Sequence, residues 1–338
     1  MPNVYRLLGG PGSPYSHKLR AALRYRRIPH VWIVPQGGFG GSGGLGDGTE
    51  LEKAGKGMVP VLQYPDGGYR ADSTPILYDL EARHAGRSIV PDDPGHAFLA
   101  HLIEDMADEW LPLPMFYFRW TDDQRWCAER QMVGWIGAVD DEALASQAQA
   151  FLDRQAAQLA AGGLDAWPRE TVLAQYDAVL DILERQLRES LFLFGSRPSL
   201  AEFGLYGQLT QYAVDPFVCT RMKQRAVRVY QWVHLMDDAS GVDGQWLEPD
   251  AELSAPLRDL VGLAGRVHLP ILQRMLEQGG GPRQAYKGHC LLWLRCELAD
   301  LPAPARERIE PLLREAGCWD ALQLAPGERE SAPPMLPV

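Results

Sequence analysis

Hydrophobic and polar positions divide the chain into a short mixed section and a long helical one. Over the first 90 residues, short runs of β-branched, aromatic and leucine residues alternate with turns and with two amphipathic stretches. Such runs predict strands, and apolar residues three and four positions apart predict helices. The predicted elements are strands at 4–8, 31–34, 61–64 and near residue 69, and helices over 14–27 and from residue 73. Their order is β-α-β followed by β-β-α.

A glycine-rich segment interrupts this first section. Residues 36–57 contain ten glycines, and glycine disfavours a helix by about 1 kcal/mol per position. Thr49 and Glu52 carry a capping-box pattern, which predicts one brief helix. The segment is therefore expected to be either a mobile lid or a disordered connector.

From residue 95 onward, apolar residues recur at the three- and four-residue spacing of amphipathic helices. The stripe from Phe98 to Trp110 predicts the first helix, and the prolines of Leu111–Pro114 are expected to end it. Ser199 and Glu202 form a capping box, which predicts a helix start at that point. Further helices are predicted over 123–139, 142–160, 169–189, 199–213, 222–236, 256–277, 285–299 and 305–316.

The length of 338 residues predicts two domains. The turn-forming residues 91–95 separate an α/β domain over 1–90 from an all-helical domain over 95–324, which includes an extension beyond about 240. Residues 325–338 contain four prolines and are expected to form a loose tail.

Composition and charge narrow the range of functions. Hydrophobic residues make up 46% and charged residues 23% of the chain, as in soluble globular proteins. The net charge of -11 disfavours general nucleic-acid binding. Residues 1–90 nevertheless hold 11 Lys and Arg against 7 Asp and Glu. This surplus suits a small anionic ligand, although an acidic helical domain explains the same asymmetry.

Neither a membrane span nor a metal site is expected. No apolar run is long enough to cross a bilayer, so a membrane partner is not predicted, and the N-terminus does not resemble a signal peptide. The five cysteines are scattered and odd in number. They predict neither a disulfide framework nor a metal centre, and they fit the reducing cytoplasm.

Three short motifs of the first domain carry candidate chemistry. In Gly12–Arg20 (GSPYSHKLR), Pro14 suits the first turn of a helix and places Ser13 at the N-cap. Met58–Leu62 (MVPVL) puts a Val-Pro pair just before a strand, and Ala71–Leu77 (ADSTPIL) puts an Asp-Ser pair before a helix. A helix N-terminus favours anions through its free N–H groups and its dipole.

Taken in this order, the three motifs resemble the glutathione-binding half of a glutathione S-transferase. Ser13-Pro14-Tyr15-Ser16 stands where thiol-disulfide relatives carry Cys-Pro-Tyr-Cys, so the resemblance is to the serine-type enzymes. It implies a thioredoxin-like α/β N-terminal domain followed by an all-α C-terminal domain, glutathione as co-substrate, no metal, and a cytoplasmic homodimer. The resemblance covers residues 1–90 well and 95–236 more loosely, and the extension beyond about 240 has no counterpart.

By this resemblance, Ser13 is the catalytic residue that stabilises the glutathione thiolate. A hydroxyl that donates to sulfur at a helix N-terminus favours negative charge there. Ser16 and Tyr15 are the substitutes for this role. The same residues also fit a Ser13 that caps the helix and does nothing more.

The other two motifs imply the residues that hold glutathione. Val59 and Pro60, joined by a cis peptide bond, bind the cysteinyl backbone. Ser73 binds the γ-glutamyl carboxylate, and Asp72 binds the α-amine. The alternatives are that Pro60 is a plain strand-entry proline and that Asp72 and Ser73 are an ordinary helix cap.

In this family the second substrate is usually an apolar electrophile. The candidates for its site lie where the first helices of the C-terminal domain should face glutathione, and they are Trp110, Met115, Phe116, Tyr117 and Trp120. Aromatic residues at this density are also the ordinary content of a core. Asp105 and Glu109 on the same helix are expected to be solvated.

Three functions remain open at this point. The chain is a transferase that attaches glutathione to a hydrophobic electrophile, a glutathione-dependent isomerase or lyase, or a binding or structural module without catalysis. The glycine-rich segment and the unfamiliar extension keep the third possibility open.

Overall fold

A computed structural model describes residues 4–34, 50–55, 57–137 and 139–334. The N-terminal domain is built on a four-stranded mixed sheet in the order β2-β1-β3-β4. β1 (Tyr5–Leu8) and β2 (His30–Ile33) are parallel, and β3 (Val61–Gln63) is antiparallel to both β1 and β4 (Tyr69–Ala71).

Helices complete this domain. α1 (Pro14–Tyr25) connects β1 to β2, and α3 (Ser73–Arg83) follows β4 and packs against α1. The brief helix α2 (Glu50–Lys53) lies where the capping box predicts it. Most of the glycine-rich segment lies outside the described residues, so the structure does not test whether it is a lid or a connector. The predicted order of elements and the α/β class of the domain are confirmed.

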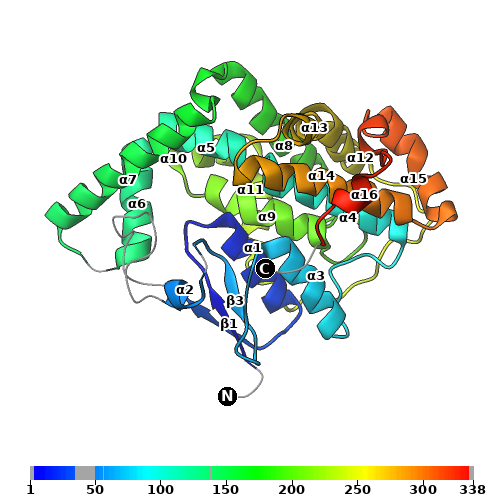
Figure 1. Cartoon of the computed structure of the whole chain (residues 1–338), viewed down its shortest axis with the longest axis horizontal. Coiled ribbons are helices and arrows are strands. Elements are labelled where there is room, and N and C mark those ends of the chain that lie inside the picture. The colour runs from blue at the N-terminus through cyan, green and yellow to red at the C-terminus, as the bar shows by residue number, and fades with distance from the viewer. Residues whose placement is uncertain (1–3, 35–49, 56, 138, 335–338) are drawn as a thin grey trace.

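The second domain is all helical (Figure 1), as predicted. In the described part of the chain, no helix is both long and apolar enough to cross a membrane. Up to residue 236 its helices are α4 (Pro94–Glu109), α5 (Pro112–Thr121), α6 (Gln124–Ile136), α7 (Asp141–Ala161), α8 (Arg169–Glu189), α9 (Leu200–Tyr212), α10 (Pro216–Arg225) and α11 (Val227–Met236). The extension adds α12 (Ala255–Leu263), α13 (Leu269–Gln278), α14 (Pro282–Asp300), α15 (Ala303–Glu315) and α16 (Glu328–Ser331).

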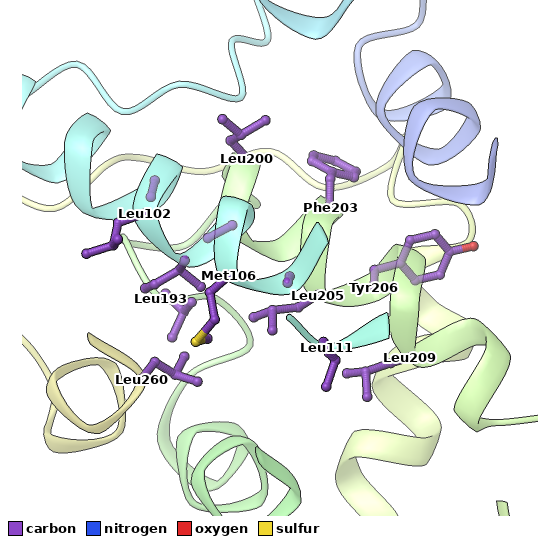
Figure 2. Packing of buried hydrophobic residues seen from close by; sticks show 14 of the residues in the cluster. Leu102, Met106, Leu111, Leu193, Leu200, Phe203, Leu205, Tyr206, Leu209 and Leu260 are labelled. Atoms are coloured by element: carbon purple, nitrogen blue, oxygen red, sulfur yellow. The ribbon is translucent and has the colours of Figure 1, made fainter. Parts of the chain in front are cut away.

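α9 lies at the centre of the core. All of its residues are buried, and it contacts both α4 and α1, so it joins the two domains. Ser199 and Glu202 form the predicted capping box at its start. Figure 2 shows Met106 of α4 between Leu205 of α9 and Leu260 of α12, all in one apolar cluster. The extension is therefore part of the main core.

Two predicted helices differ from the structure, and one helix was not predicted. α4 ends at Glu109, as the prolines of Leu111–Pro114 predict, but a further helix that was not predicted, α5, begins at Pro112, because proline is tolerated in a first turn whose N–H groups have no helical partner. The helix predicted over 222–236 is two helices, α10 and α11, which meet at Ala226. The helix predicted over 256–277 is interrupted between α12 and α13 by a π-helical turn, Ala264–His268.

The tail also differs from the expectation, since residues 325–334 are fastened to α14. They include α16, whose Glu328 forms an ion pair with Arg295. Trp293 Nε1 of α14 donates to the Pro333 carbonyl at 2.7 Å. Residues 335–338 lie outside the described part.

Candidate functional site

The sheet register brings the three motifs to one edge of the N-terminal domain. Leu8 at the end of β1 is opposite Val61 at the start of β3, and Val61 is opposite Ala71 at the end of β4. The loop that leads to Ser13, the Val59-Pro60 pair and the Asp72-Ser73 pair therefore all adjoin the same end of the sheet.

Ser13 caps α1, as predicted. Its backbone is extended (φ -102°, ψ 112°), and its Oγ accepts a hydrogen bond from the Ser16 N–H at 3.2 Å. The residue is half-buried. Because the cap uses only an oxygen lone pair, the hydroxyl hydrogen stays available to a ligand. Capping and ligand binding by Ser13 are therefore compatible.

The two substitute hydroxyls are engaged within the protein. Ser16 is fully buried, and its Oγ accepts from the Gly10 N–H at 3.3 Å. Tyr15 donates its hydroxyl to the carbonyl of Asp108 at 2.9 Å, and burial raises the pKa of Tyr15 well above its usual value. Both side chains fasten the loop and α1. Ser13 is the better-placed donor, because Tyr15 already donates its hydroxyl hydrogen and Ser16, which like Ser13 only accepts, is fully buried whereas Ser13 is half-buried.

α6 packs directly on the loop before Ser13. A Cβ added at Gly10 would lie 2.4 Å from the Trp135 ring, and one at Gly12 would lie 1.8 Å from Gln131 Oε1. Glycine at these two positions lets α6 approach the loop backbone. One wall of the site is therefore formed by α6.

The Val59-Pro60 peptide bond is cis, as the resemblance implies. Pro60 is buried and Val59 is half-buried. Val59 contacts a small apolar cluster at the sheet and also an aromatic cluster that contains Trp120 and Trp135. The pair thus lies between the edge of the sheet and the aromatic helices of the second domain.

Asp72 and Ser73 stand at the start of α3, where helical N–H groups are free. Asp72 has a φ of 75°, which non-glycine residues seldom adopt. Its Oδ2 accepts from the Tyr286 hydroxyl at 2.6 Å, and burial raises the pKa of the carboxyl. Ser73 is buried, and its Oγ accepts from the Lys18 ammonium at 3.3 Å. The Ser73 hydroxyl hydrogen is therefore left for another acceptor.

A buried ion network, not predicted from the sequence, adjoins these residues. The Lys18 side chain is 0% exposed, and its Nζ donates to Thr74 Oγ1 at 2.9 Å, to Asp108 Oδ2 at 2.6 Å and to Glu104. Burial opposes the charge of Lys18, but the two carboxylates outweigh it and raise its pKa. Burial also raises the pKa of Asp108 to about 8, although Lys18 lowers it. The sequence did carry one signal that Lys18 is buried, because Lys18 shares a helix face with the apolar residues three and four positions after it.

The structure divides the candidates for the second substrate. Trp110, Met115 and Tyr117 are buried in the main core, and Trp110 is only 1% exposed. Phe116 and Trp120 belong to the aromatic cluster, which also contacts the residue before the cis proline. These two are therefore the members that lie nearest the edge of the sheet where the motifs meet.

The expectation that Asp105 and Glu109 are solvated is wrong. Asp105 is buried and is hydrogen-bonded with His268 Nε2 at 2.6 Å. Glu109 forms an ion pair with Lys287 at 2.8 Å. Both partners belong to the extension, so the face of α4 that looks polar in the sequence is covered when the extension docks.

The assembled site offers a hydroxyl donor at each of two helix N-termini and one carboxylate. This set can hold a small ligand that carries both an anionic and a cationic group. No cluster of three or more His, Cys, Asp or Glu side chains that could bind a metal ion occurs among the described residues.

Several solved structures resemble this chain. A glutathione S-transferase from Methylobacillus flagellatus, determined with GSH bound, is 18% identical over 70% of this chain and 96% of that one, with a TM-score of 0.43. A GST-like protein from Pseudomonas syringae is 18% identical over 79% of this chain and 75% of that one, with a TM-score of 0.46. A beta-etherase from Sphingobium is 16% identical over 77% of this chain and 98% of that one, with a TM-score of 0.48.

Family models match both domains, whereas no curated protein matches. The model described as "Glutathione S-transferase, N-terminal domain" matches residues 7–88. The model described as "Glutathione S-transferase, C-terminal domain" matches residues 142–250. Since the two matches together take in more than half of the chain, this protein belongs to the glutathione S-transferase family.

Proposed function

We propose that this chain binds glutathione between the starts of α1 and α3 and activates its thiol for attack on a hydrophobic electrophile. The observation that carries the proposal is the sheet register, which brings Ser13, Val59-Pro60 and Asp72-Ser73 to one edge. Glutathione has the matching groups, since its γ-glutamyl end carries a carboxylate and an ammonium and its central residue carries the thiol.

Ser13 donates its hydroxyl hydrogen to the glutathione sulfur. Its oxygen is already held by the Ser16 N–H, so the donor needs little reorganisation when charge develops on sulfur. The N-terminus of α1 adds partial positive charge, which favours the thiolate over the thiol. The thiol releases its proton to water, the thiolate forms a C–S bond with the electrophilic carbon, and the leaving group departs with the bonding electrons.

The γ-glutamyl end is held at the start of α3. Asp72 accepts from the α-ammonium, and Ser73 donates to the carboxylate. Lys18 supports this geometry because its ammonium donates to Ser73 Oγ and so directs the hydroxyl hydrogen elsewhere. Val59 and Pro60 bind the cysteinyl part through their main chain.

The electrophile lies against Phe116 and Trp120, which adjoin Val59. The working form is a cytoplasmic homodimer. All five cysteines are free, which suits a reducing compartment. Sedimentation velocity at micromolar concentration tests the dimer, and a monomer would contradict that part of the proposal.

Calorimetric titration with reduced glutathione is the first test. Saturable one-site binding that is lost in the Asp72→Ala/Ser73→Ala variant supports the site, whereas no binding at millimolar glutathione refutes it. Conjugation of an aryl halide tests the reaction itself. Binding without conjugation would favour an isomerase, a lyase or a non-catalytic module.

A further inference from the structure

The C-terminal extension reaches the candidate γ-glutamyl site. Tyr286, in the first part of α14, donates its hydroxyl to Asp72 Oδ2 at 2.6 Å, across 214 residues of sequence. The phenol is half-buried and lies on a helix that neither family model covers. A residue of the extension therefore occupies one oxygen of the carboxylate proposed to bind the α-ammonium.

α14 is firmly docked, so the place of Tyr286 is set by the fold. The helix (orange in Figure 1) packs along α4 and α13. The residue next to Tyr286, Lys287, pairs with the Glu109 carboxylate at 2.8 Å and also donates to the Glu109 carbonyl. Further along the helix, Glu297 pairs with the buried His101. Ion pairs at two points along α14 thus hold it against α4.

The chemistry of the pair defines what Tyr286 can do. Burial raises the pKa of the Tyr286 phenol well above its usual value, so the phenol keeps its proton and acts as a donor. A carboxylate has two oxygens, and the hydrogen bond at Oδ2 leaves Oδ1 for a ligand. The phenolic oxygen keeps its own lone pairs, which can accept an N–H from an ammonium group next to Asp72.

We propose that Tyr286 is a positioning residue of the γ-glutamyl subsite, supplied by the extension, which orients the Asp72 carboxylate toward the free α-ammonium of the ligand. The proposal rests on the glutathione site proposed above. It assigns the extension a role in ligand specificity: the site selects thiol peptides that carry a free γ-glutamyl α-ammonium and rejects those in which this amine is missing.

The test compares two ligands in two proteins. Glutathione and its analogue without the α-amine, glutaryl-cysteinyl-glycine, are titrated calorimetrically into the wild type and Tyr286→Phe. Loss of a hydrogen bond to a charged group predicts roughly tenfold or greater weakening of glutathione binding. Affinity for the analogue, which lacks the group that Asp72 binds, should stay within about twofold. In turnover, KM for glutathione rises while kcat at saturating glutathione is unchanged.

Two controls separate positioning from a general structural effect. Tyr230→Phe makes the same chemical change on α11, where the ring contacts His234 and Lys223, and it should leave both affinities unchanged. In an Asp72→Asn background, Tyr286→Phe should weaken glutathione binding no further, because its effect passes through Asp72.

The outcomes are distinguishable. If the wild type binds glutathione and Tyr286→Phe binds it equally well or more tightly, Tyr286 does not position Asp72 and the proposal is overturned. Equal losses for glutathione and the analogue would also overturn it, because they would mean a structural role. If the wild type fails to bind glutathione at all, the proposed function falls, and this assignment falls with it.

Discussion

Replacement of Lys18 by methionine tests how the buried ion network supports the site. Lys18→Met keeps the length of the side chain but removes an ammonium that donates to Ser73, Thr74, Glu104 and Asp108. The side chains of Glu104 and Asp108 are only 1% and 8% exposed, so water cannot replace the lost charge.

The magnitude follows from which charges remain. Burial already raises the pKa of Asp108, and loss of the Lys18 ammonium removes the charge that lowers it, so in the variant this carboxyl takes up a proton and the uncompensated charge falls on Glu104. Removal of one partner of a buried ion pair costs about 3–5 kcal/mol. That loss is a large part of the roughly 5–15 kcal/mol by which folded domains are usually stable.

Urea unfolding at pH 7 measures the effect as a lower midpoint with an unchanged slope. The matched variant Lys18→Met/Glu104→Gln removes both charges and should recover at least about half of the loss, because no buried charge is then unpaired. A loss below about 1 kcal/mol in Lys18→Met, or an equal loss in the double variant, would refute the account of the network as a compensated buried charge.

Three further predictions concern the loop, α14 and the domain interface. Ser13→Ala should lower kcat roughly 100-fold, as loss of a preorganised donor does, with little change in glutathione affinity. Ser13→Thr retains the hydroxyl and is the control, and a wild-type kcat for Ser13→Ala in steady-state kinetics would contradict the catalytic role. Burial lowers the pKa of His101, but Glu297 outweighs burial and raises this pKa to about 9. The stability that the pair contributes is complete below the unfolded pKa near 6.5, and on the order of 3 kcal/mol is lost as pH rises to about 9. Between pH 6 and pH 9 the melting temperature should fall less in His101→Gln than in the wild type. An identical fall would exclude the His101–Glu297 pair as its source. Gly207→Ala places a Cβ 2.8 Å from the carbonyl of residue 14 on α1 and should cost about 1–3 kcal/mol in urea unfolding, whereas Gly134→Ala, whose nearest contact is 3.8 Å, is the control and should cost less.

Local sequence signals were sufficient where neighbouring residues decide the structure. Ser13 and Pro14 predict the start of α1, and Ser199 and Glu202 predict the start of α9, because a cap depends on residues within one turn. The prolines of 111–114 correctly predict the end of α4, but the start of α5 at Pro112 was missed. Proline is compatible with both, since it cannot continue a helix but needs no N–H partner in a first turn.

The candidate site was predictable as three motifs but not as a complete environment. The order of Ser13, Pro60 and Asp72 along the chain was visible in the sequence, and the register of β1, β3 and β4 then brought them to one edge. Lys18 was not identified, because a charged residue on an amphipathic helix looks solvent-exposed until its partners are known. The aromatic candidates were likewise divided between core and site by packing alone.

The sequence by itself determined the class of the two domains, most of the helices and the chemical type of the residues that meet at the sheet edge. These features follow from periodicity, caps and turns, which act over a few residues. Only the tertiary structure decided that the extension joins the core, that Lys18 is compensated by Glu104 and Asp108, and that Tyr286 contacts Asp72. Such contacts join segments far apart in the chain, and they form because buried charges and hydrogen-bonding groups must find partners when packing removes water.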